Sequence, residues 1–110
     1  MPTDGLFKPL RRGLLEFAVL TALSTGRHYA ADVVERLANT PFATQEGTLY
    51  PLLSKMRRDG LLDHEWEESD SEPPRKYYRV TWSGTEQLRM LVAYWRQLDD
   101  TLTELGANDE

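Results

Sequence analysis

The spacing of hydrophobic residues changes at Gly60, and this change limits the folds that the chain can adopt. Before Gly60, apolar residues recur at the three- and four-residue intervals of helices that bury one face. Residues 62–67 then alternate between apolar and charged positions, and residues 76–82 are rich in aromatic and β-branched side chains, as β-strands are. From residue 83 the helical spacing returns. We therefore expect three helices, a β-hairpin and a final helix, in that order.

Three helices are predicted before the hairpin. The first spans residues 10–24, after a loose start, and is apolar on most sides, which indicates burial on more than one side. The second spans residues 29–38. The third runs through residues 44–59, with Thr44 as its N-cap. Pro51 removes one hydrogen bond inside this helix, but the apolar periodicity continues past it.

The hairpin and the final helix complete a winged-helix pattern. Residues 68–74 form an acidic, proline-containing turn between the strands, and Ser83 with Glu86 forms a capping box at the start of the last helix. Three compact helices followed by a hairpin describe a winged helix-turn-helix, a mainly α fold with a β-hairpin wing (α+β). In such folds the second helix of the helix-turn-helix motif, here the third of the chain, lies in the major groove of DNA.

The final helix carries a regular apolar seam, with successive members three or four residues apart. Its residues are Leu88, Leu91, Trp95, Leu98, Leu102 and Leu105. This is the a/d pattern of a coiled coil. A terminal helix of one isolated domain rarely needs so regular a seam, whereas a second copy of the helix would cover it. The expected organisation is a DNA-binding unit, residues 1–82, and a dimerisation helix, residues 83–110, in a homodimer.

Composition excludes several classes of protein. The chain of 110 residues has no cysteine, so disulfide scaffolds, thiolate metal sites and cysteine nucleophiles are excluded. We find no phosphate-binding loop, metal-ligand spacing or catalytic triad, and predict no enzyme activity, no cofactor, no metal and no catalytic residue. Without an apolar leader or a membrane-crossing stretch, the chain is expected in the cytoplasm with no membrane partner. The net charge is −5, but the first 60 residues are slightly basic.

Three motifs together resemble the PadR family of transcriptional regulators. They are Gly-Thr-Leu-Tyr-Pro-Leu-Leu at 47–53, Gly-Leu-Leu at 60–62, and Arg-Lys-Tyr-Tyr-Arg-Val-Thr at 75–81 followed by Gly84. The segment around Trp95 is similar to the branch with a single C-terminal helix. The resemblance implies a winged-helix repressor, and in multidrug-binding members of this branch the paired tryptophans of a dimer sandwich flat aromatic compounds. The chain departs from the family's pattern at the wing tip, where prolines replace glycines and the surroundings are acidic.

Candidate DNA contacts follow from the winged-helix interpretation. Thr44, Gln45 and Thr48 open the third predicted helix, where side chains reach base edges in the major groove. The alternative is that Thr44 only caps the helix and Gln45 is solvated. Cations and tyrosines near this helix and on the wing are candidates for phosphate contacts: Lys8, Arg12, Tyr29, Tyr50, Lys55, Arg75 and Lys76. The alternative for the cations is an ordinary solvated helix face, and for the tyrosines it is packing.

A ligand site is the second candidate. Trp95 lies on the seam, and a large indole near a two-fold axis leaves a slot that a ligand could fill. Residues of the first helix and one carboxylate after Trp95 would wall it: Glu16, Phe17, Leu20 and Asp99. Indole faces with carboxylates suit an aromatic cation. The alternative is that Trp95 is only a coiled-coil core residue.

The sequence thus favours a homodimeric repressor that reads a pseudo-palindromic operator in double-stranded DNA and is released by a small aromatic effector. The competing hypothesis is a winged-helix module that binds proteins and never contacts DNA, which the acidic wing and the negative net charge favour. Salt separates the two, because phosphate contacts make DNA affinity fall steeply as salt rises.

Overall fold

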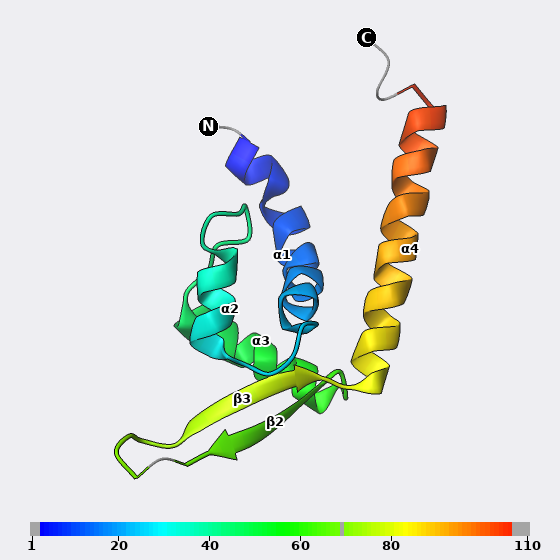
Figure 1. Ribbon diagram of the computed structural model, residues 1–110. Helices are drawn as coiled ribbons and strands as arrows, with labels where there is room; N and C mark the ends of the chain where they lie inside the picture. The colour runs from blue at the N-terminus through cyan, green and yellow to red at the C-terminus, as the bar shows by residue number, and fades with distance from the viewer. Residues whose placement is uncertain (1–2, 69, 107–110) are drawn as a thin grey trace.

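The computed structural model describes residues 3–68 and 70–106 and contains four helices and a three-stranded sheet within these ranges (Figure 1). The elements are α1 (Thr3–Leu23), β1 (His28–Tyr29), α2 (Ala30–Leu37), α3 (Glu46–Arg58), β2 (Leu62–Glu67), β3 (Arg75–Val80) and α4 (Trp82–Glu104). The predicted order of three helices, a hairpin and a final helix is confirmed, and so is the α+β class. Pro51 lies inside α3, as expected.

Several predicted helix ends are wrong. Helix α1 begins at Thr3 rather than after a loose start, and includes Pro9, whose fixed φ is compatible with a helix. Helix α3 is preceded by Gln45, not Thr44, as its N-cap, and no side-chain cap bond forms there. Helix α4 has Thr81 as its N-cap, because its hydroxyl accepts a hydrogen bond from the Gly84 amide at 3.0 Å. The predicted capping box at Ser83 is therefore wrong.

The sheet is antiparallel with strand order β1-β3-β2. Strands β2 and β3 form the hairpin, in a register that pairs Leu62 with Val80 and Trp66 with Lys76. The short β1 was predicted as the beginning of the second helix, and instead places Tyr29 beside Tyr77 of β3. Sheet pairing thus ties the chain just before α2 to the hairpin.

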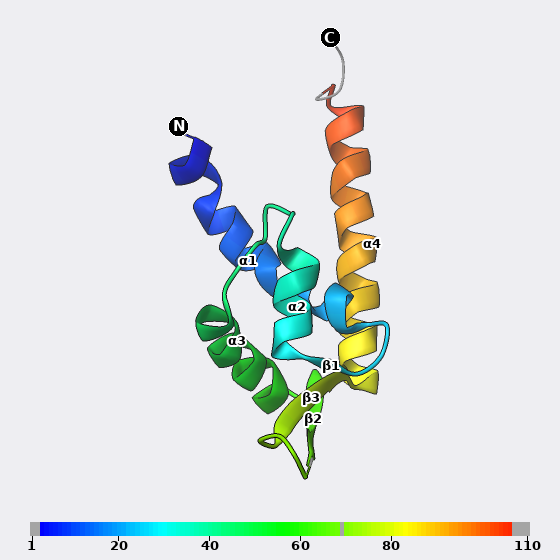
Figure 2. The same cartoon turned by 60° about the vertical axis from the view of Figure 1, so that its left-hand side comes forward.

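The core lies where α1, α2 and α3 meet one face of the sheet (Figure 2). Each helix contributes fully buried side chains, among them Leu20 from α1, Val33 from α2 and Leu49 and Leu53 from α3, and Tyr78 supplies the sheet's largest one. The apolar spacing before Gly60 is therefore the spacing of core positions.

Helix α4 packs on the body only through its first half. Leu88 and Leu91 are half-buried against the core, whereas Leu98, Leu102 and Leu105 are 39%, 42% and 79% exposed. Figure 1 shows the C-terminal half of α4 extending away from the sheet without another element against it. Throughout residues 3–68 and 70–106, we find no helix with both the length and the apolar character needed to cross a membrane.

Gly84 joins α4 to the hairpin at a point with no room for a side chain. A Cβ there would lie 2.2 Å from the Leu61 carbonyl oxygen and 2.6 Å from Cγ1 of Val80. The same carbonyl accepts the Thr81 amide at 3.0 Å, so it cannot move freely.

We predict that Gly84→Ala lowers the free energy of unfolding by at least about 2 kcal/mol, because the methyl group overpacks a hydrogen-bonded backbone. Gly13→Ala is the matched control, since a Cβ at that helical position meets nothing within 4 Å. The control should raise stability by about 0.5–1 kcal/mol. Chemical denaturation of both variants measures this, and equal stability of Gly84→Ala and wild type would refute the packing argument.

His64 should make stability depend on pH. Its ring packs edge-on to Tyr78, and its Nδ1 is buried without a hydrogen-bond partner. Burial lowers the pKa of His64 below its ordinary value of 6.5, and the nearby charges of Lys76 and Arg57 lower it further. The unfolded chain therefore binds the proton more readily than the folded one, so stability is highest above pH 6.5 and declines as the pH falls below it.

We predict that the melting temperature of the wild type falls between pH 7.5 and pH 5.5, and that His64→Phe shows a smaller fall. Thermal denaturation followed by circular dichroism at both values tests this. A fall of the same size in both proteins would assign the pH dependence to other groups.

Candidate nucleic-acid interface

The N-terminal end of α3 is open to solvent. Leu49, Leu53 and Met56 point into the core, so the opposite face of the helix is outward. Gln45 at the N-cap and Thr48 in the first turn are exposed, whereas Thr44 is only half-exposed. Two of the three residues predicted to read bases therefore have side chains free to reach a groove.

A cavity of about 380 Å³ lies between α3, β1 and the hairpin. We call it the wing cavity, and it is lined by Tyr29, Tyr50, Trp66, Pro74, Arg75 and Lys76. The structure thus brings together four of the predicted phosphate-binding residues, from three separate parts of the chain. Tyr50 is 46% exposed, which fits both a phosphate contact and the half-buried packing of the alternative interpretation.

Sequence reasoning missed Trp66. The alternation in residues 62–67 placed it on the same face of the strand as Leu62, which is buried. Trp66 is instead 60% exposed, because it lies at the end of β2, and Figure 1 shows that this end of the hairpin extends beyond the helices. Its exposure could have been expected from its position at the end of the strand, four residues after the last buried residue, Leu62.

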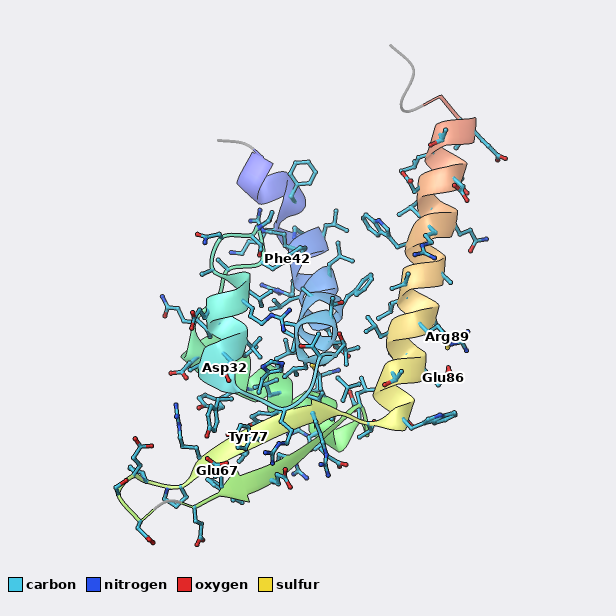
Figure 3. The ribbon with its side chains drawn as sticks, viewed as in Figure 1. Asp32, Phe42, Glu67, Tyr77, Glu86 and Arg89 are labelled. Carbon is cyan, nitrogen blue, oxygen red and sulfur yellow. The ribbon has the colours of Figure 1, made fainter. Side chains whose placement is uncertain are left out.

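Four side chains form a stack on the other face of the hairpin. The rings of Tyr29 and Tyr77 lie 4.1 Å apart and nearly parallel, with Arg75 3.9 Å above Tyr29 and Arg27 4.5 Å from Tyr77. The Tyr29 hydroxyl donates to Glu67 at 2.9 Å, and Figure 3 shows Glu67 and Tyr77 together on the hairpin. Such cation–π contacts hold the two arginines in defined positions.

The hydroxyl of Tyr29 is held in its protonated form. The hydrogen bond with Tyr77 raises the pKa of Tyr29 most, and burial and the Glu67 carboxylate raise it further. Tyr29 is therefore a hydrogen-bond donor at all ordinary pH values, but in this structure Glu67 accepts that bond.

The remaining predicted cations lie outside the wing cavity. Lys55 Nζ lies 3.0 Å from Asp59 and 3.5 Å from Glu16, and its hydrogen bond to Asp59 raises its pKa. Lys8 and Arg12 are exposed one turn apart on the first half of α1. Figure 1 shows that this half lies at the opposite end of the molecule from the hairpin.

A second, larger cavity of about 490 Å³ lies between α1, α2, the loop before α3, and α4. We call it the apolar cavity, because most of its lining is hydrophobic: Leu14, Phe17, Leu37, Pro41, Phe42 and Trp95. Two of the predicted ligand residues, Phe17 and Trp95, therefore meet within one chain. Phe42 reaches the cavity from the loop, as Figure 3 shows.

The other predicted ligand residues are placed elsewhere. Leu20 is fully buried in the core, because it lies on the inner face of α1. Glu16 turns toward Lys55 of α3. Asp99 is exposed on α4 and does not line the cavity. Among the described residues that line the apolar cavity there is consequently no carboxylate, so this cavity of a single chain offers no acidic partner for the expected aromatic cation.

The comparisons with known proteins agree with this architecture. A model of the transcriptional regulator PadR-like family matches residues 19–90. A PadR-like transcription factor from Bacteroides fragilis is 38% identical with a TM-score of 0.81, and the match covers 93% of this chain and 99% of that one. A PadR family regulator from Eggerthella lenta is 37% identical with a TM-score of 0.81, covering 94% of this chain and 90% of that one.

The fold is also that of PadR from Bacillus subtilis, whose structure was solved in complex with operator DNA. That protein is 21% identical with a TM-score of 0.67, and the match covers 72% of this chain and 45% of that one. Because the family model spans most of this chain and the two closer structures match it nearly end to end, the chain belongs to the PadR-like family of transcriptional regulators.

Proposed function

We propose that the chain is a homodimeric repressor that binds a pseudo-palindromic operator in double-stranded DNA. The observation that carries this proposal is the exposed N-terminal end of α3 beside the wing cavity, which is lined by Arg75 and Lys76. Gln45 can make a paired hydrogen bond to adenine, and Thr48 can contact a thymine methyl group or a phosphate. The operator complex of Bacillus subtilis PadR supports DNA as the partner. Such a role requires the cytoplasmic location expected from the sequence.

The dimer is proposed from α4. Its second half presents Trp95, Leu98, Leu102 and Leu105 to solvent on one helix face, which a second copy would bury. Leu88 and Leu91 pack against the core of their own chain. They would therefore hold the dimerisation helix, residues 83–110, in place instead of contacting the partner. A two-fold dimer would place its two α3 helices about 34 Å apart, one turn of DNA, each carried by a unit of residues 1–82.

We further propose that a small, flat and uncharged aromatic compound binds in the apolar cavity. A volume of about 490 Å³ suits such a ligand, and Phe17, Phe42 and Trp95 offer aromatic surfaces. Pro41 and Phe42 belong to the loop that leads into α3. A ligand that favours one position of this loop would change the spacing of the two reading helices and release the operator.

We predict that Gln45→Ala weakens binding to a selected operator about tenfold and leaves binding to random DNA unchanged, because the amide reads a base and not the backbone. Gln97→Ala, an exposed glutamine of α4, is the matched control and should bind the operator as the wild type does. Fluorescence anisotropy with labelled duplexes at several salt concentrations measures both affinities.

The same titration decides between DNA binding and a protein-interaction module. Wild-type affinity for the operator that exceeds its affinity for random DNA, and that falls steeply with salt, is expected of a repressor. Equal and weak affinity for both duplexes would contradict the proposed function and favour a protein partner.

For the ligand site, we predict that a neutral flavone quenches the tryptophan fluorescence of the wild type and that Trp95→Ala lowers its affinity at least tenfold. Trp82→Phe is the control, because Trp82 lies at the start of α4 and does not line the apolar cavity. Calorimetry gives the affinities independently of the fluorescence. Unchanged flavone affinity in Trp95→Ala would move the site elsewhere.

A further inference from the structure

Trp66 is an exposed indole that neither packs in the core nor belongs to α3. It lies on β2 directly opposite Lys76 of β3, and the Lys76 ammonium sits 4.9 Å from the centre of its ring. At 60% exposure, the ring buries too little surface for a role in the core. A tryptophan that keeps most of its surface in water and holds a cation over one face is suited to contact a ligand.

The wing cavity defines the kind of ligand. Arg75 and Lys76 give it two positive charges, and the Tyr50 hydroxyl adds a donor. None of the described lining residues is acidic, although the chain as a whole carries −5. The Glu67 carboxylate accepts a hydrogen bond from the hydroxyl of Tyr29, one of the lining residues. An anionic group can therefore approach this cavity from solvent without meeting a carboxylate in its wall.

Resting on the proposed function, we propose that Trp66 and Lys76 form one contact to the sugar-phosphate backbone of the operator. The strand would pass through the wing cavity between α3 and the hairpin, with a deoxyribose against the indole and its phosphate at Lys76. The ring holds the lysine ammonium in place, so less side-chain freedom is lost when the phosphate binds. This contact is indifferent to sequence, because sugar and phosphate carry no base information.

The position of Trp66 also explains how an acidic wing can bind DNA. The carboxylates Glu65 and Glu67 lie at strand positions that alternate with Trp66, so their side chains leave the sheet on the opposite face. There they are engaged by Arg27 and Tyr29. The indole of Trp66, Lys76 and Tyr50 remain on the cavity side, whereas Arg75 alternates with Lys76 and packs over Tyr29.

The test compares Trp66→Leu, Trp66→Phe and Lys76→Gln with the control Trp82→Leu. Trp82 is 79% exposed but lies outside the wing cavity, so its substitution removes an exposed indole without changing that cavity. We expect Trp66→Leu to weaken binding to operator and to random DNA by the same factor, about tenfold, and Trp66→Phe to recover part of it. Trp82→Leu should bind as the wild type does.

A double-mutant cycle tests whether the two side chains act as one contact. The combined variant Trp66→Leu, Lys76→Gln should lose much less affinity than the product of the two single losses. Lys76→Gln should also reduce the slope of log affinity against log salt by about one, the contribution of one phosphate contact.

Tryptophan fluorescence provides a readout that does not depend on affinity. DNA should change the emission of the wild type and of Trp82→Phe, but much less that of Trp66→Phe. Wild-type affinity in Trp66→Leu, with an unchanged DNA-induced signal in Trp66→Phe, would overturn this inference and leave the proposed function intact. A wild type that binds neither duplex would overturn both.

Discussion

The junction between the hairpin and α4 fixes the direction of α4, and with it which half of the helix is buried and which is exposed. The Leu61 carbonyl accepts the Thr81 amide, the Thr81 hydroxyl donates to the Gly60 carbonyl, and the absent side chain at Gly84 lets the helix start directly against this backbone. The direction of α4 is thereby fixed relative to β3. One half of the helix covers the core, and the other half carries its leucines into solvent.

The cations of the chain differ in whether a carboxylate pairs with them. Lys55 is engaged by Glu16 and Asp59, and Arg27 by Glu65, so these charges stabilise the packing between elements. The cations at the wing cavity are held by aromatic rings instead, with Arg75 above Tyr29 and Lys76 above Trp66. A ring positions a cation without neutralising it. This difference lets a chain with a net charge of −5 keep charged side chains at the wing cavity beside α3.

The local sequence pattern predicted the helices and the hairpin, whereas strand pairing and the surroundings of individual side chains depend on tertiary packing. Apolar spacing predicted the helices and the core face of α3, and even Pro51 did not mislead, because Leu52 and Leu53 continue the pattern. The strand β1 was missed, since two residues carry no periodicity and pair only because Tyr77 lies opposite. Phe17 and Trp95 were predicted to share a slot at a dimer interface, and both line the apolar cavity of a single chain. Glu16 and Leu20 do not line this cavity, because the rotation of α1 turns them toward Lys55 and the core.

The proposed repressor function depends on a second chain that covers the exposed half of α4. Pairing of the two helices would set the distance between the two copies of α3, and the apolar cavity lies beside Trp95 on the same seam. Sedimentation equilibrium of the wild-type protein at micromolar concentration tests this most directly. We expect a single species of twice the chain mass of 12.7 kDa. A species with the mass of one chain would contradict it.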